Sequence, residues 1–196
     1  YTDIPYPFGK FDVVLLPAFQ FSGMEHPGAI FYSAQALLLE PSATRERQLA
    51  RADVIAHETS HIWFGDLWTM RWFDDVWMKE ALATFMASKI VNPRFPDLDH
   101  DLRFLHTNYP SAYDVDRTAG THAIRQPLDN LNEASSLYGP IIYLKSPIVM
   151  RQLAAQIGEQ TLRDVLCEFL AMYRFSNASW EDLLDLLASH TALDLH

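Results

Sequence analysis

Short apolar runs separated by turn residues mark the amino-terminal part of the chain. Apolar runs at residues 11–16 and 29–32 flank a segment at 21–28 that contains two glycines and a proline. Clusters of glycine and proline between apolar runs are typical of turns, so this order predicts strand, turn and strand. We therefore expect a small strand-rich part over residues 1–41.

Two helical patterns follow this part. Good helix formers continue without glycine or proline from about Ser42 to about Phe64, where Gly65 interrupts them, and this predicts one long helix. A second pattern, with apolar residues spaced three and four apart, runs from about Val76 until it is stopped by Asn92-Pro93.

The rest of the chain is less regular at first and then helical again. Residues 93–137 are rich in Asp, Asn, Pro and Tyr, which indicates loops and short helices. Ser146-Pro147 is a good pair to cap and open a helix that ends before Gly158, a second helix is expected over 161–174, and Ser179 caps a third. Together these patterns predict an α+β fold, with a small sheet packed on a mainly helical part, residues 42–196.

Composition narrows the classes of function. The chain has 196 residues and a net charge of −10, and its 15 Lys and Arg residues are scattered, which argues against a nucleic-acid partner. No apolar run approaches the roughly 18 to 20 residues that a membrane-spanning helix needs. Cys167 is the one cysteine, which excludes an internal disulfide and a thiolate zinc cluster.

The first residues do not resemble a natural amino terminus. They contain no initiator Met and no signal peptide pattern, so we expect a fragment excised from a longer protein. Such a fragment says little about the compartment of its parent, and the sequence predicts no localisation.

Residues 57–61 carry the pattern that most sharply indicates chemistry. His57 and His61 are four positions apart and therefore share one face of the predicted helix, where both imidazoles can bind one metal ion. Glu58 is rotated by about a quarter turn of helix away from His57, which suits a base acting on water activated by the metal. An isolated pattern of this kind also fits ordinary surface residues, but apolar residues at 54–56 and 62–64 favour a buried site.

A catalytic zinc usually has three protein ligands, so a third donor is needed. Glu80 is the best candidate, since it follows His61 by 19 positions and falls in the first turns of the second predicted helix. Two histidines and one glutamate form a known type of hydrolytic zinc site. The sequence therefore predicts one Zn²⁺ per chain, with Glu58 as the catalytic base.

At this point the sequence resembles the aminopeptidase N group of gluzincins, which includes relatives of leukotriene hydrolase. The resemblance covers nearly the whole chain and rests on four blocks in the same order. These blocks are Gly23-Met24-Glu25, His57 to Asp66, Trp77 to Ala83, and Tyr143-Leu144-Lys145. It implies a thermolysin-like catalytic domain over residues 1–196, whose β-rich and helical neighbouring domains are absent from this fragment.

The resemblance also implies roles for residues outside the zinc pattern. Glu25 would hold the free α-ammonium of a peptide substrate, with Gly23 and Met24 as further substrate-binding residues; the alternative is a turn with a solvated glutamate. Tyr143 would donate a hydrogen bond to the oxyanion, although it can also be ordinary core, and Tyr138 is a nearby alternative.

The sequence departs from the family pattern at two positions near the site. His26 stands where the family usually has Asn, and it is interpreted as a substrate contact or a hydrogen-bond donor behind the site. Lys145 is followed by Ser146 where the family has Gly. Lys79 and Arg71 are interpreted as solvated.

The predicted function is hydrolysis of the amino-terminal peptide bond of peptides, with zinc and Glu58 activating water. Its partners would be a peptide with a free amino terminus and the flanking domains of the full-length protein. The alternatives are a thermolysin-like endopeptidase, a bifunctional hydrolase, and a non-catalytic zinc-binding or metal-free interaction module. An intact Glu58 beside Glu25 and Tyr143 favours the enzyme.

Overall fold

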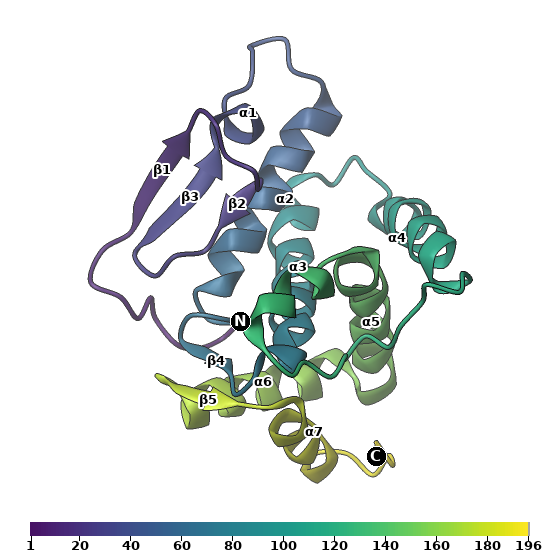
Figure 1. The fold of residues 1–196 in the computed structure, drawn as a ribbon. Helices are drawn as coiled ribbons and strands as arrows, with labels where there is room; N and C mark the ends of the chain where they lie inside the picture. The colour runs from purple at the N-terminus through teal and green to yellow at the C-terminus, as the bar shows by residue number, and fades with distance from the viewer. Residues whose placement is uncertain (196) are drawn as a thin grey trace.

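A three-stranded sheet opens the chain in the computed structural model, which describes residues 1–195 (Figure 1). The strands are β1 (Asp12–Leu16), β2 (Gly23–Met24) and β3 (Ala29–Ser33), in the order β1-β3-β2. β1 pairs with β3 in parallel, and β2 pairs with β3 antiparallel. The short helix α1 (Ala34–Leu37) follows directly.

The segment predicted as a turn at 21–28 contains a strand of its own, which the sequence pattern did not show. β2 is only two residues long, so it leaves no alternating pattern to detect. The reversal comes after it, where Gly28 adopts a φ of 77° that favours glycine. This arrangement makes β2 an edge strand of the sheet.

The two long helices predicted from the hydrophobic pattern and the helix formers are confirmed. Thr44 caps the first by accepting a hydrogen bond from the Arg47 backbone, and Gly65, with a φ of 145°, lies just beyond its end. The elements of this region are α2 (Arg45–His61), β4 (Trp68–Met70), η1 (Phe73–Asp75), α3 (Val76–Val91) and η2 (Asn92–Arg94). α2 and α3 lie side by side in the middle of the molecule (Figure 1).

The expectation of loops and short helices over 93–137 is wrong in its first half. A 17-residue helix, α4 (His100–Asp116), begins after Asp99, whose side chain accepts from the Leu102 backbone. Pro110 lies inside this helix and removes one backbone donor, and its apolar pattern is weak because little of it is buried. The segment after α4 is irregular as expected, up to η3 (Leu131–Leu137).

The carboxyl-terminal helices follow the prediction except at one start. Ser146 does not cap α5, because a π-helical turn, η4, already precedes it and the Ser146 hydroxyl donates to the Ile142 carbonyl inside this turn. Ser179 does cap the last helix, in a reciprocal capping box with Asp182. The elements are η4 (Ile141–Lys145), α5 (Ser146–Ile157), α6 (Glu159–Tyr173), β5 (Ser176–Ala178) and α7 (Trp180–Ser189).

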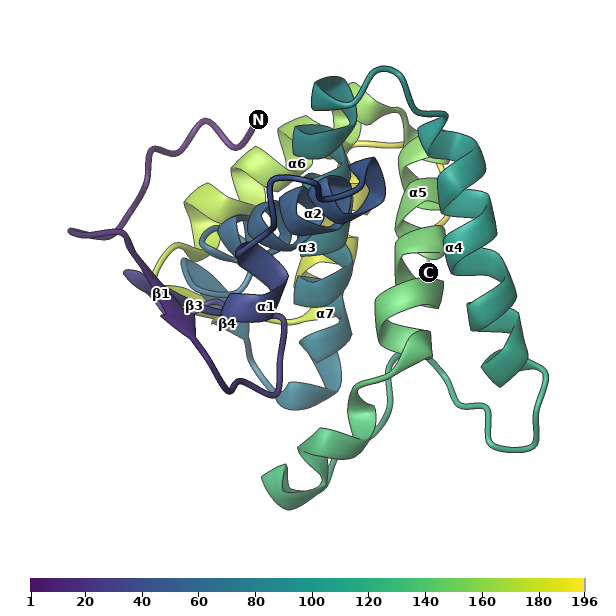
Figure 2. The same cartoon turned by 90° about the horizontal axis from the view of Figure 1, so that it is seen from above.

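The main apolar core lies behind α3. It joins α3 to α5, α6 and α7 and includes Trp68 and Ala178 of β4 and β5, which pair in parallel. Viewed from above, α4 and α5 run beside each other on the far side of α3 from the sheet (Figure 2). The carboxyl-terminal helices therefore form a base on which α3 is fixed.

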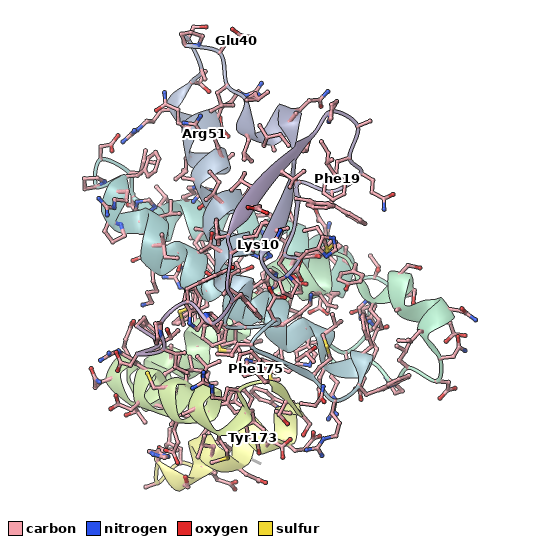
Figure 3. All side chains as sticks on the ribbon, turned by 90° about the vertical axis from the view of Figure 1, so that its left-hand side faces the viewer. Lys10, Phe19, Glu40, Arg51, Tyr173 and Phe175 are labelled. Atoms are coloured by element: carbon pink, nitrogen blue, oxygen red, sulfur yellow. The ribbon has the colours of Figure 1, made fainter. Side chains whose placement is uncertain are left out.

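A smaller core joins the sheet to α2 through Ile30, Tyr32 and Ile62. Seen from the sheet side, Phe175 lies between the strands and the carboxyl-terminal helices, and its ring is 6.3 Å from that of Phe8 (Figure 3). The expected α+β fold, a small sheet on a mainly helical part, is confirmed. Within residues 1–195, no helix is long and apolar enough to cross a membrane.

Candidate metal centre

Three donor atoms from α2 and α3 meet at one point. His57 Nε2 is 3.1 Å from His61 Nε2, and Glu80 Oε2 is 3.3 Å from the former and 3.4 Å from the latter. The helix spacing places both imidazoles on one face of α2, and α3 brings the carboxylate to the same face. The structure thus brings together the three predicted ligands.

The edges of this triangle suit a tetrahedral zinc ion. Zinc binds nitrogen and carboxylate oxygen at about 2.0–2.2 Å, which places tetrahedral ligands about 3.3–3.5 Å apart. The donors in this group of described residues are two imidazole nitrogens and one carboxylate oxygen, all of which zinc accepts. The residues present therefore fit the ion that the sequence predicts.

Neighbouring groups fix the orientation of both imidazoles. His61 Nδ1 lies 3.0 Å from the Phe64 carbonyl oxygen, which can only accept, so Nδ1 carries the proton and Nε2 keeps its lone pair for a metal. His57 Nδ1 is 3.3 Å from the Thr84 hydroxyl on α3. Phe64 and Thr84 were not singled out from the sequence, since a backbone carbonyl and a hydroxyl carry no recognisable pattern.

Glu80 is held in its charged form. Burial opposes ionisation, but the contacts with the His57 and His61 imidazoles and the nearby charge of Lys79 outweigh it, so the pKa of Glu80 lies well below its usual range. A carboxylate that stays ionised is the form that a cation requires.

Glu58 lies beside the triangle without forming one of its corners. Burial raises its pKa to about 7, and the charges of Glu25 and Glu80 act in the same direction while His57 opposes them. Its side chain touches the backbone of β2, where a Cβ on Gly23 would collide with Glu58 Oε1. Glu58, Glu25 and His61 form a second group whose donor atoms lie within 4.8 Å of one another.

Glu25 extends from the loop after β2 towards the same point. Its side chain is only 12% exposed, accepts a hydrogen bond from Lys79 Nζ and lies 3.9 Å from His61 Nε2. Burial opposes ionisation, but the charges of His61 and Lys79 outweigh it and lower the pKa of Glu25. The alternative of a solvated glutamate in a turn is therefore wrong.

All of these groups line one cleft of about 1090 Å³. Gly23 and Met24 contribute the free edge of β2, and Tyr138 and Tyr143 contribute two stacked rings with centroids 6.1 Å apart. Tyr143 is 39% exposed, whereas Ile141 and Ile142 beside it are buried, so Tyr143 is not ordinary core. The structure brings the three predicted metal ligands, Glu58 and Tyr143, and the predicted substrate-binding residues at 23–25 to this cleft.

Comparison with known proteins shows to which family the chain belongs. The model of the peptidase family M1 domain matches residues 1–196 of the chain. The chain belongs to peptidase family M1. The resemblance to aminopeptidase N is confirmed by this match.

Relatives of this M1 domain are named aminopeptidases. It is 34% identical to "Probable aminopeptidase 1" of Sulfurisphaera tokodaii over 195 residues, all of this chain and 25% of that protein. It is 37% identical to the puromycin-sensitive aminopeptidase of Caenorhabditis elegans over 187 residues, 95% of this chain and 20% of that protein. A leucyl aminopeptidase of Saccharolobus solfataricus is 32% identical over 195 residues, again 25% of its length. The M1 domain thus spans a fifth to a quarter of these relatives.

Two residues of the M1 domain lie elsewhere than the sequence suggested. Lys79 is not solvated: its side chain is largely covered and lies between Glu25 and Glu80, whose charges outweigh its burial and raise its pKa. His26 is not among the described residues that line the cleft, and its ring packs edge to face on Phe31 at 4.9 Å. Arg71 is exposed as expected and pairs with Asp182.

Proposed function

We propose that this M1 domain is the thermolysin-like catalytic domain of a zinc-dependent aminopeptidase, which hydrolyses the amino-terminal peptide bond of peptides. The observation that carries the proposal is the triangle of His57, His61 and Glu80, with Glu58 and Glu25 facing the same cleft. Membership of a peptidase family and relatives named aminopeptidases support the same conclusion.

His57, His61 and Glu80 would hold the ion. A zinc ion held there would supply Lewis-acid polarisation of the scissile carbonyl and lower the pKa of water. Glu58 accepts a proton from the attacking water and then gives it to the leaving amine. Its raised pKa suits this exchange, because a group whose pKa is near neutral can both take and release a proton.

Substrate position would be set by β2 and the loop after it. β2 is an edge strand, so Gly23 and Met24 can offer backbone groups to an extended peptide, as an added strand would use them. The Glu25 carboxylate binds the substrate α-ammonium and so places the first peptide bond beside Glu58. The carboxylate oxygens of Glu25 and Glu58 lie within 4.8 Å of each other, which leaves room for one residue between anchor and base, so the product would be a free amino acid.

Tyr143 would donate its hydroxyl proton to the oxyanion that forms on attack. Burial is the largest cause that raises its pKa, followed by the charges of Glu80 and Tyr138, so the phenol stays protonated and able to donate. The charge of Glu58 acts on the pKa of Tyr143 in the same direction.

Replacement of the base tests the proposed function. In the full-length protein, Glu58→Gln should lower kcat for aminoacyl-anilides by about 10²–10⁴-fold, because the general base is lost, while zinc content stays unchanged. Glu46→Gln, in the exposed first turn of the same helix, is the matched control and should leave both unchanged. Undiminished hydrolysis by a zinc-loaded Glu58→Gln protein would contradict the mechanism.

Blocking the substrate distinguishes the remaining alternatives. An aminopeptidase should lose most of its activity on amino-acetylated peptides, whereas a thermolysin-like endopeptidase should keep it. A non-catalytic zinc-binding module should show no turnover of either substrate with zinc bound. These assays need only one panel of free and acetylated peptides.

A further inference from the structure

Lys79 lies inside the cleft, directly before Glu80 on α3. Its side chain is 14% exposed, its Nζ donates a hydrogen bond to Glu25 Oε1, and it lies 3.5 Å from Glu80 Oε1. Its aliphatic stem approaches Gly65, where a Cβ would be 3.3 Å from Lys79 Cδ. The ammonium group is therefore held against the carboxylate that the proposed function assigns to the substrate amino terminus.

Two other cations line the cleft, but each is paired away from Glu25. Nη2 of Arg103 on α4 is 2.5 Å from Asp53 Oδ2, and Nη2 of Arg151 on α5 is 2.5 Å from Asp101 Oδ1. Among the described lysines and arginines that line the cleft, Lys79 is thus the one paired with Glu25. The carboxylates that surround Lys79 Nζ are those of Glu25 and Glu80, which both belong to the site.

A second ammonium group that binds to Glu25 is repelled by the charge of Lys79. A substrate α-ammonium that approaches Glu25 meets Lys79 at hydrogen-bond distance from the same carboxyl group, and two like charges this close repel strongly in a partly buried cleft. A substrate with a neutral amino terminus meets no such repulsion.

We propose that Lys79 is a specificity-determining residue that competes with the substrate α-ammonium for Glu25 and so weakens the preference for free over blocked amino termini. This inference rests on the proposed role of Glu25 in aminopeptidase activity. Peptides with a free amino terminus remain the better substrates, but Lys79 reduces their advantage over peptides whose amino terminus is neutral. The opposite role, in which Lys79 merely holds Glu25 in place for the substrate, predicts the opposite result on removal of its charge.

The test compares two ligands that differ only at the amine. L-leucinol carries a free ammonium but no scissile bond, and N-acetyl-L-leucinol is its neutral counterpart. In the full-length zinc-loaded protein, Lys79→Met should tighten L-leucinol binding by about tenfold and leave N-acetyl-L-leucinol binding unchanged, as measured by calorimetry. Free-over-acetylated selectivity in kcat/KM should rise by a similar factor, chiefly through a lower KM for free peptides.

Matched variants separate charge from packing. Lys79→Arg keeps the charge and should behave as wild type. Lys89→Met removes a lysine of the same helix that pairs with Glu159 and does not line the cleft, and it should leave the binding of both ligands unchanged. Lys79→Gln removes the charge but keeps a donor to Glu25, so it provides the same readout if the Met variant loses zinc. Zinc content is measured for every variant, because Lys79 adjoins Glu80.

The outcomes are distinct from those that test the proposed function. If zinc binding and hydrolysis are intact but L-leucinol binding is unchanged or weaker in both neutral variants, the inference about Lys79 is overturned and the proposed function stands. If the wild-type protein neither binds zinc nor hydrolyses aminoacyl-anilides, both are overturned. Tighter L-leucinol binding with unchanged N-acetyl-L-leucinol binding supports the inference.

Discussion

The two sides of α3 differ in what they bury. One side faces the cleft and carries Lys79, Glu80 and Thr84 among the charged groups of α2 and β2. The other side packs Met78 and Leu82, both fully buried, into the apolar core with the carboxyl-terminal helices. A single helix thus separates a polar site from a hydrophobic core.

This difference separates chemistry from stability. Buried charges are costly, and here Glu25, Lys79 and Glu80 offset that cost by pairing with one another or with the imidazoles of α2. Buried apolar side chains supply most of the folding free energy. Substitutions on the core side should therefore change stability, and substitutions on the cleft side should change activity.

The largest expected effect lies on the core side, at Phe169 of α6. This ring is fully buried, and its centroid is 5.1 Å from that of Trp68. Phe169→Ala should lower the free energy of unfolding by about 3–5 kcal/mol, because it leaves a cavity in the core. Denaturant unfolding measures the change, with Met172→Ala on the exposed side of the same helix as the control. If Phe169→Ala lowers the free energy of unfolding by no more than Met172→Ala does, this core is not the main source of stability.

On the cleft side, Tyr143→Phe should act on catalysis alone. Loss of a hydrogen-bond donor to the oxyanion should lower kcat by about 10²–10³-fold with little change in KM, zinc content or unfolding midpoint. Tyr138→Phe, on the ring stacked beside it, should cost much less. If Tyr138→Phe has the larger effect on kcat, the donor is Tyr138.

A smaller and more selective effect is expected at Gly23. A methyl group there would displace the Glu58 carboxylate, which is the far end of a flexible side chain and moves at little cost to folding. Gly23→Ala should therefore lower kcat by about 10-fold to 100-fold through misplacement of the base, with zinc retained. Gly9→Ala, where a Cβ meets nothing within 4 Å, is the control. Unchanged kcat would show that Glu58 does not need its observed position.

The triangle of candidate metal ligands could be predicted because its information is local. His57, Glu58 and His61 lie within five consecutive residues, so helix geometry alone places them, and Glu80 follows on a second helix with a clear periodic pattern. The capping box at Ser179 is local in the same way.

The features that sequence reasoning missed depend on contacts between distant segments. Lys79 is 54 positions from Glu25, so its burial could not be seen from its neighbours in the chain. β4 and β5 are three residues each and pair across more than a hundred positions. α4 was missed because Pro110 interrupts its pattern and side chains such as Leu102 and Leu105 are left half exposed.

Zinc content is the measurement that tests the central claim most directly. After exposure to excess zinc and removal of free ion, the full-length wild-type protein should retain one zinc per chain at this site, and Glu80→Ala should lose it together with activity. A wild-type protein that retains no zinc, or a Glu80→Ala protein that retains it in full, would contradict a metal centre formed by His57, His61 and Glu80.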